Sequence, residues 1–270
     1  MKRRSAPRGE YTIGDWADLA AREPTESFDA IVTDPPYGRL TSNRWDRAPD
    51  WETLAHACRR LLRGKAPPFV VFGRQPQMSV LGRGFEAAGW ELRDEALWVK
   101  GNTAIWHGGK KFRHAHENIW WFLPHGAPQE AIFFDAASIS PARAQRAVYR
   151  KRPLSETQRF SKQPGVVIAH KTIPPLSILS YPPLVRWARV RVGHPTEKPG
   201  GLMELLIRLF VPIGGRILDP FAGSGSTIRG ALAAGRFAKG YDSDPRWEAA
   251  LRAACRTTRI ERPGRNTGGC

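Results

Sequence analysis

Cysteine is scarce in this chain of 270 residues, which contains only three. Cys58, Cys255 and Cys270 lie far apart and share none of the short spacings that zinc-binding motifs use. Domains that depend on disulfides use many more cysteines for their length. The sequence therefore predicts a fold held by an apolar core in a reducing compartment.

Long apolar runs are also missing, since none approaches the roughly 18 residues that a membrane-spanning helix needs. The N-terminal segment MKRRSAPRGEY is basic but lacks the apolar stretch of a secretory signal, so we expect none. Hydrophobic residues still make up 41% of the chain, enough for an ordinary globular core. The length predicts one large domain, or one domain with a sizeable insertion.

Acidic residues are few: 25 Asp and Glu oppose 42 Lys and Arg, for a formal net charge of +17. Such an excess favours a polyanionic partner, most simply nucleic acid, although genome composition can also enrich arginine. Residues 124–192 are rich in proline and hold 11 basic against 3 acidic residues, a local balance of +8. We expect this block to be an irregular basic insertion.

Outside that block, strand and helix patterns alternate. Apolar residues recur at helical spacing from Trp51, with Asp50 as a plausible N-cap. We expect strands at residues 10–13, 28–34, 68–73, 90–100, 117–123, 215–219 and 236–242. We expect helices at residues 16–21, 51–62, 76–88, 199–210 and 245–257, and in the alanine-rich segment after residue 227. This alternation predicts an α/β fold with a mostly parallel sheet covered by helices on both faces.

The first chemical signal is the segment FDAIVTDPPYG at residues 28–38, in which a buried strand runs into Asp34, Pro35, Pro36 and Tyr37. Two successive prolines fix φ and donate no backbone N–H, so the turn is rigid. Taken alone, the pattern also fits a strand end with a solvated acid as its cap.

The second signal is DPFAGSGST at residues 219–227, an acid at a strand end followed by a glycine-rich turn into a helix. No lysine follows the second glycine, as a triphosphate loop requires, and the third glycine of a dinucleotide fingerprint is absent. The next strand ends at Asp242, where an α/β fold places an acid for ribose hydroxyls. This half is therefore predicted to bind a nucleoside without a polyphosphate.

Together these residues resemble the amino-methylating DNA methyltransferases that use S-adenosylmethionine. DPPY (34–37) is similar to their catalytic motif, DPFAGSGST (219–227) to their cofactor loop, and HPTEKP (194–199) to the segment before it. The order of these motifs resembles that of the circularly permuted β-class. Weaker similarities are Gly14-Asp15, WVKGN (98–102) and HENI (116–119), so that the resemblance covers roughly residues 10–123 and 192–255.

The resemblance implies a Rossmann-like methyltransferase fold in which residues 1–123 form the catalytic half and 193–257 the cofactor-binding half. Residues 124–192 would be the target-recognition region and 258–270 a flexible tail. The implied catalytic residues are Asp34, Pro35, Pro36 and Tyr37. The implied cofactor-binding residues are Asp15, Asp34, His194, Thr196, Lys198, Asp219, Pro220, Phe221, Ala222, Gly223, Ser224, Gly225, Ser226, Thr227 and Asp242.

The implied reaction transfers a methyl group to the N6 amine of adenine in double-stranded DNA, after the base has left the duplex. Methylation of cytosine N4 is the nearest alternative, although those enzymes more often carry serine where Asp34 stands. Methylation of RNA or of a protein glutamine, which usually comes with asparagine there, and a non-catalytic basic DNA-binding protein are further alternatives.

The implied partner is DNA, with a homodimer and a cognate restriction endonuclease as further candidates, in the cytoplasm of a bacterium or from a phage. No metal site is expected, since His114, His116 and Glu117 lack accompanying cysteines or a helical two-histidine spacing. The residues expected to contact nucleic acid are Arg143, Arg146, Arg150, Lys151, Arg152, Arg159 and Lys162.

Overall fold

The computed structural model describes residues 7–38, 47–100, 114–139, 175–182, 194 and 196–256. The strands are β1 (Gly9–Ile13), β2 (Ala30–Thr33), β3 (Phe69–Gly73), β4 (Trp90–Val99), β5 (His116–Pro124), β6 (Ile178–Ser180), β7 (Arg216–Asp219) and β8 (Phe237–Asp242). The helices are α1 (Trp16–Arg22), α2 (Trp51–Leu61), α3 (Gln77–Ala87), α4 (Gly200–Phe210), α5 (Ser226–Ala233) and α6 (Glu248–Arg256). No helix in these ranges combines the length and apolar character needed to cross a membrane.

The strands form one sheet in the order β1-β8-β7-β2-β3-β5-β4-β6. All neighbouring pairs are parallel except those of β5, which runs antiparallel to both β3 and β4. Parallel neighbours need crossover connections, which the helices supply. The expected mostly parallel α/β sheet is confirmed.

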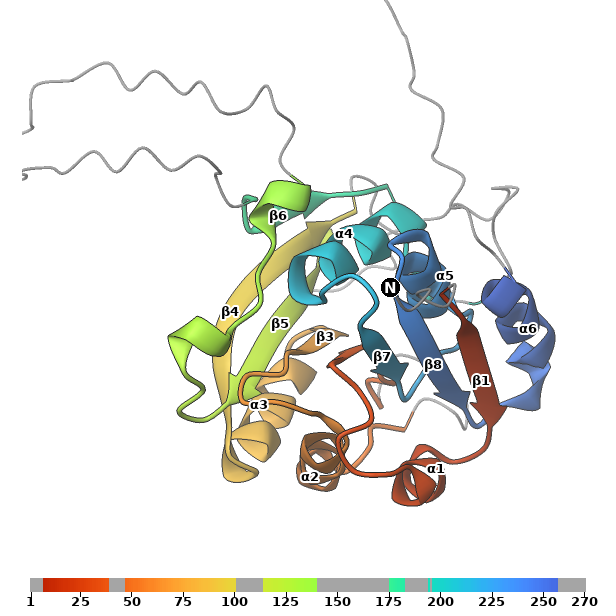
Figure 1. Ribbon diagram of the computed structural model, residues 1–270, viewed down its shortest axis with the longest axis horizontal. Coiled ribbons are helices and arrows are strands. Elements are labelled where there is room, and N and C mark those ends of the chain that lie inside the picture. The colour runs from red at the N-terminus through yellow and green to blue at the C-terminus, as the bar shows by residue number, and fades with distance from the viewer. Residues whose placement is uncertain are drawn as a thin grey trace, which may run out of the picture.

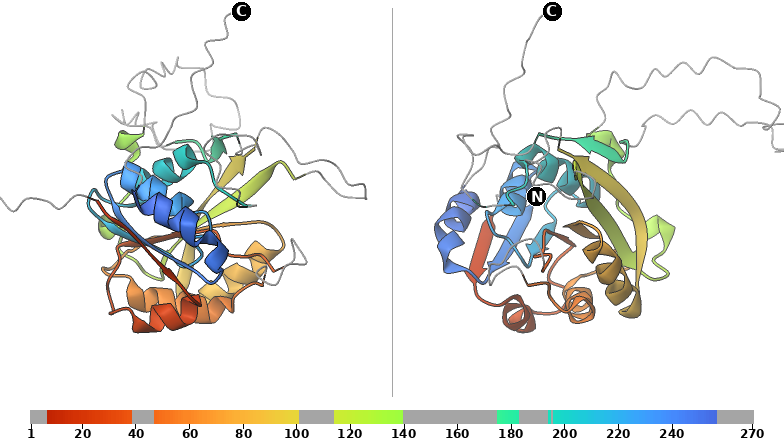
Figure 2. Two further views of the ribbon diagram at one scale, coloured as in Figure 1. Left: turned by 90° about the vertical axis from the view of Figure 1, so that its right-hand side faces the viewer. Right: turned by 180° about the vertical axis from the view of Figure 1, so that it is seen from behind.

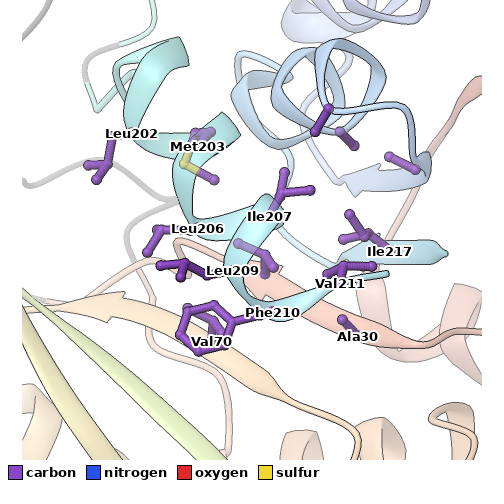
Figure 3. Close-up of a cluster of buried hydrophobic side chains, with 14 of the residues drawn as sticks. Ala30, Val70, Leu202, Met203, Leu206, Ile207, Leu209, Phe210, Val211 and Ile217 are labelled. Atoms are coloured by element: carbon purple, nitrogen blue, oxygen red, sulfur yellow. The ribbon is translucent and has the colours of Figure 1, made fainter. Parts of the chain in front are cut away.

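Helices cover both faces of the sheet, with α1, α2 and α3 on one side and α4, α5 and α6 on the other (Figures 1 and 2). Because both faces are covered, a central strand such as β3 is buried along its whole length. The apolar stripe predicted for α4 packs on the sheet, and Figure 3 shows its buried side chains over Ala30, Val70 and Ile217. The side chain of Asp50 accepts a hydrogen bond from the Thr53 N–H, which confirms the predicted cap of α2.

The order in which the chain adds strands to the sheet reverses between the parallel neighbours β7 and β2. From β7 the chain passes through α5 to β8 on one side, whereas from β2 it passes through α2 to β3 on the other (Figure 1). At such a switch point the two loops leave the sheet on opposite faces and open a crevice at the carboxyl ends of the strands. The DPPY turn follows β2 and the glycine loop follows β7, so both lie at this crevice.

One strand was not predicted. Residues Ile178–Ser180 form β6, which pairs in parallel with the end of β4 from within the block expected to be irregular. Three residues between proline-rich segments carry too little periodicity to be recognised as a strand. Part of the basic block thus extends the sheet.

Candidate active site

Two strand ends that are far apart in the sequence meet in one cavity. β2 and β7 pair through Ala30 with Ile217 and Ile31 with Leu218, and the Thr33 hydroxyl donates to Asp219 Oδ1 at 2.7 Å. The cavity beside them is lined by Asp34, Pro35, Pro36, Tyr37, His194, Thr196, Lys198, Met203, Asp219, Phe221, Ala222, Gly223, Ser224, Ser226, Thr227, Asp242, Ser243, Asp244 and Trp247. The DPPY turn and the glycine loop therefore form a single site.

The carboxylate of the DPPY turn is held at both oxygens. Tyr37 donates its hydroxyl to Asp34 Oδ1 at 2.7 Å, and Lys198 Nζ contacts Oδ2. Burial raises the pKa of Asp34, and the positive charge of Lys198 only partly offsets this effect. The Asp34 side chain is 16% exposed, so a ligand in the cavity can reach it.

A second carboxylate lies on the far side of the Lys198 ammonium. Glu117 of β5 lies 3.3 Å from Lys198 Nζ through Oε2, and Lys100 Nζ lies 2.5 Å from its Oε1. Burial alone would raise the pKa of Glu117, but the two ammonium groups outweigh it and hold the pKa below its usual range. Asp34 and Glu117 together raise the pKa of Lys198 despite its burial. These four groups form a charge-balanced cluster beside the cavity.

The glycine loop brings bare backbone to the cavity. Gly223 has φ +49°, and a Cβ at this position would lie 2.9 Å from Nε2 of His194. Its N–H donates to Asp242 Oδ2 at 2.8 Å. The loop leads into α5, whose first N–H groups have no partner within the helix. Glycine at 223 thus leaves the space that a side chain would fill.

Asp219 and Asp242 accept hydrogen bonds from backbone N–H groups of the glycine loop. Burial raises the pKa of Asp219 to about 6, although the Thr227 and Thr33 hydroxyls and the Phe221 N–H lower it. Burial also raises the pKa of Asp242. The two oxygens of Asp242 accept from backbone N–H groups, those of Gly223 and Asp244, each at 2.8 Å. Asp242 therefore fixes the loop, and a contact of this acid with ribose stays a prediction.

Of the remaining predicted residues, some line the cavity and others do not. His194 packs edge-on against Trp247 with ring centroids 4.5 Å apart, and the Thr196 N–H donates to His194 Nδ1 at 3.3 Å. Asp15 is exposed, caps α1 through the Ala17 N–H at 2.8 Å and is not among the lining residues. Pro220 and Gly225 belong to the loop without lining the cavity. The seven basic residues expected to contact nucleic acid, at positions 143–162, lie outside the described residues.

Sequence reasoning missed several residues of the site. Met203, Ser243, Asp244 and Trp247 line the cavity, and Glu117 with Lys100 adjoins it. The segments WVKGN and HENI, which supply Lys100 and Glu117, carried a signal through their family resemblance. Nothing in the sequence indicated that Lys198 would link Glu117 to Asp34.

Comparisons with known proteins find similar sequences over most of the chain. A sequence model of the N6/N4 methyltransferase family, described as DNA methylase, matches residues 28–251. The chain is 26% identical over 246 residues to the Type II methyltransferase M.BglII of Bacillus subtilis, and 21% identical over 256 residues to M.HinfI of Haemophilus influenzae. These matches cover 85% and 87% of this chain but 64% of each relative, so the chain spans less than two thirds of their length.

Solved structures share the fold. The complex of M1.HpyAVI with SAM matches with a TM-score of 0.58 and 20% identity, over 92% of this chain and 99% of the other. PvuII DNA methyltransferase, described as cytosine-N4-specific, matches with a TM-score of 0.66 and 17% identity, over 95% and 89%. At these identities the likeness concerns the arrangement of the elements, and it confirms the Rossmann-like methyltransferase fold.

Proposed function

The chain belongs to the N6/N4 DNA methylase family, and from this premise we propose that it transfers a methyl group from S-adenosylmethionine to the N6 amine of adenine in double-stranded DNA. The observation that supports the proposal most is the shared cavity, in which Asp34 and the glycine loop lie at the tips of adjacent strands. A cofactor loop and an amine acceptor must face the same space for direct transfer between two substrates.

The residues of the cavity fit S-adenosylmethionine. Gly223 leaves room for close approach of a ligand, and the buried carboxylate of Asp219 suits the cationic groups of this cofactor. Phe221 and Trp247 offer apolar faces for its adenine ring, and Asp242 and Asp244 lie at the end of the next strand. When bound, the cofactor would supply a methyl group activated by a sulfonium.

Asp34 and the Pro35 carbonyl would receive the target amine. Its nitrogen is a poor nucleophile because the lone pair is delocalised into the ring. Two acceptors, one for each N–H, favour a pyramidal nitrogen whose lone pair points toward the methyl group. Asp34 would accept the proton that the amine nitrogen releases once it carries the methyl group. The rigid prolines hold these acceptors in place.

Tyr37 is placed to contact the ring of the target base. Its side chain is buried, lines the cavity and is fixed by its hydrogen bond to Asp34. A base paired in a duplex cannot expose its amine to a cavity of this kind, so the base must be flipped out. An aromatic wall beside the acceptor would then stabilise the flipped base.

The rest of the protein would hold the DNA. The basic residues of 124–192 would contact phosphates and supply affinity that does not depend on sequence. We place the protein in the bacterial cytoplasm, where its DNA substrate is found. A second copy of the chain and a cognate restriction endonuclease complete the proposed partners, the latter because both curated relatives are Type II methyltransferases.

Nucleoside analysis tests this assignment. The chain is expressed in a host that lacks DNA methyltransferases of its own. The DNA of these cells is digested, and its nucleosides are separated and identified by mass spectrometry. We expect N6-methyladenine. N4-methylcytosine would overturn the choice of base and keep the class of reaction. Unmodified DNA would contradict the proposed function, and an S-adenosylmethionine titration would then identify a basic DNA-binding protein by the absence of binding.

A further inference from the structure

In the chain without substrate, the predicted amine acceptor is already occupied. Both Asp34 oxygens have donors, with the Tyr37 hydroxyl on Oδ1 and the Lys198 ammonium on Oδ2. The neutral amine of a base is a weaker partner for a carboxylate than an ammonium group is. For the amine to take the lone pair of Oδ2 that Lys198 uses, Lys198 must leave this position.

Lys198 cannot simply move into water. Its side chain is 5% exposed, and an isolated ammonium in such a site carries a large desolvation penalty. The ammonium therefore needs a second carboxylate within a short movement. Glu117 fulfils this condition, because its Oε2 lies 3.3 Å from Lys198 Nζ.

Glu117 is also prepared to receive a hydrogen bond. Lys100 holds its Oε1 at 2.5 Å, which fixes the carboxylate in place. Oε2 is buried and, among the described residues, accepts no hydrogen bond of good geometry. A buried carboxylate oxygen with this orientation is expected to find a donor. The ammonium of Lys198 is the donor that lies beside it.

Two aromatic rings lie beside the ammonium that is near both carboxylates. The Lys198 ammonium lies 5.1 Å from the centroid of Phe72 and 5.8 Å from that of Trp98. At these distances the ring faces attract a cation without binding it at a single point. The exchange also preserves charge, because the cluster keeps two carboxylates and two ammonium groups while a neutral base enters.

We propose that the Lys198 ammonium occupies the place of the target amine on Asp34, and that Glu117 receives this ammonium when the base enters. Lys198 and Glu117 are then positioning residues. Lys198 keeps Asp34 charged before the base arrives, and Glu117 draws the ammonium away from Asp34 as the base enters. This inference rests on the proposed function, since it requires a target amine.

A pair of variants tests the exchange. Glu117→Gln keeps the shape of the side chain but removes the charge, so that Lys198 stays on Asp34. We expect kcat for methylation of unmethylated plasmid DNA to fall at least about tenfold, with the affinity for S-adenosylmethionine unchanged by calorimetry. Adding Lys198→Met to Glu117→Gln frees Asp34, so we expect the double variant to be several times faster than the single one.

The rates are compared from pH 7 to 9, because Asp34 without its ammonium ionises less readily. The titratable groups that interact with Asp34 are then Tyr37 and Asp219, while Lys100 lies beside the neutral Gln at position 117. We therefore expect the recovery to grow toward pH 9. If Lys198 and Glu117 had purely structural roles, adding Lys198→Met would lower kcat further at every pH. That result would overturn the exchange.

A matched control breaks a similar ion pair outside the cavity. Glu23 pairs with Lys239, and their side chains are mostly shielded, at 16% and 21% exposed. Glu23→Gln is expected to leave kcat unchanged. A parental chain that methylates no DNA would overturn the proposed function and the exchange together. An active parental chain whose Glu117→Gln variant keeps full kcat would overturn the exchange alone.

Discussion

At the scale of single residues, Asp34 and Asp219 show how neighbours assign different properties to two acids of one cavity. Asp34 faces the ammonium of Lys198, whereas Asp219 is surrounded by hydrogen-bond donors from Thr33, Thr227 and the Phe221 backbone. Hydroxyl and amide donors compensate less of the desolvation of a carboxylate than a full charge does. Asp219 should therefore reduce the stability of the protein when it is ionised.

The stability effect of Asp219 is testable through pH. Burial raises its pKa in the fold from 3.8 to about 6. A raised carboxyl pKa contributes stability that is complete below pH 3.8 and lost as the pH rises through 6. Asp219→Asn removes the ionisation, so we expect the free energy of unfolding in urea to increase by on the order of 1 to 3 kcal/mol at pH 8. At pH 4 we expect no such increase.

The same variant should lose function as it gains stability, because the neutral amide attracts the cationic cofactor less. We expect weaker binding of S-adenosylmethionine in a calorimetric titration at pH 8. Equal unfolding free energies of parental and variant chains at pH 8 would contradict the effect on stability. Unchanged cofactor affinity would remove Asp219 from the proposed cofactor site.

The motif residues that line the cavity were predictable, but their contacts were not. The motifs DPPY and DPFAGSGST placed Asp34 and Asp219 at strand ends, where the structure has them. The contact of Lys198 with Asp34 and Glu117 depends on how a loop before α4 lies over β5. No local pattern encodes a contact between three segments so far apart in the sequence.

At the scale of elements, α5, which follows the glycine loop, packs closely against α4. A Cβ added at Gly230 of α5 would lie 2.8 Å from the Cβ of Met203 and 3.2 Å from the backbone nitrogen of Glu204. Both atoms belong to α4, whose backbone cannot move without disturbing the apolar cluster that it covers. Gly230 thus sets the distance between the two helices.

We expect Gly230→Ala to destabilise the protein by about 1 to 3 kcal/mol, as overpacking of a core does, despite the better helix propensity of alanine. Urea unfolding measures the change. A variant as stable as the parental chain would show that α4 can shift at no cost. That result would show that glycine at position 230 is not required for the spacing of α4 and α5.

Helices and central strands followed from periodicity, since each has enough residues to show an apolar stripe or a buried run. The predicted helix from Trp51 and the strand at 68–73 match α2 and β3 closely. The edge strand β6 was missed because three residues show no period, and its pairing with β4 is decided by the fold rather than by its own sequence.

At the scale of the whole molecule, the net charge of +17 should govern how DNA is held. When DNA binding releases counterions, the logarithm of the affinity falls linearly with the logarithm of the salt concentration. We expect the affinity for a DNA duplex, measured by fluorescence anisotropy, to fall at least about tenfold between 50 and 200 mM salt. Affinity that is independent of salt would contradict phosphate contacts as its main source.

The overall arrangement could be predicted because the order of the motifs carries topological information. A catalytic turn before the cofactor loop makes sense only if the two follow neighbouring strands at a switch point. The order β7-β2 in the sheet meets this requirement. The wall made by Trp247 and Asp244 could not be predicted, because it depends on how the segment after β8 folds back over the loop.

The most direct measurement is the rate of methyl transfer to DNA by Asp34→Ala, compared with its affinity for S-adenosylmethionine. Loss of the amine acceptor should reduce the rate at least about a hundredfold, with cofactor affinity largely intact. Asp18→Ala, which removes an exposed acid on α1, serves as the control and should behave like the parental chain. If Asp34→Ala methylates DNA at nearly the parental rate, Asp34 is not the acceptor and the shared cavity does not carry the reaction.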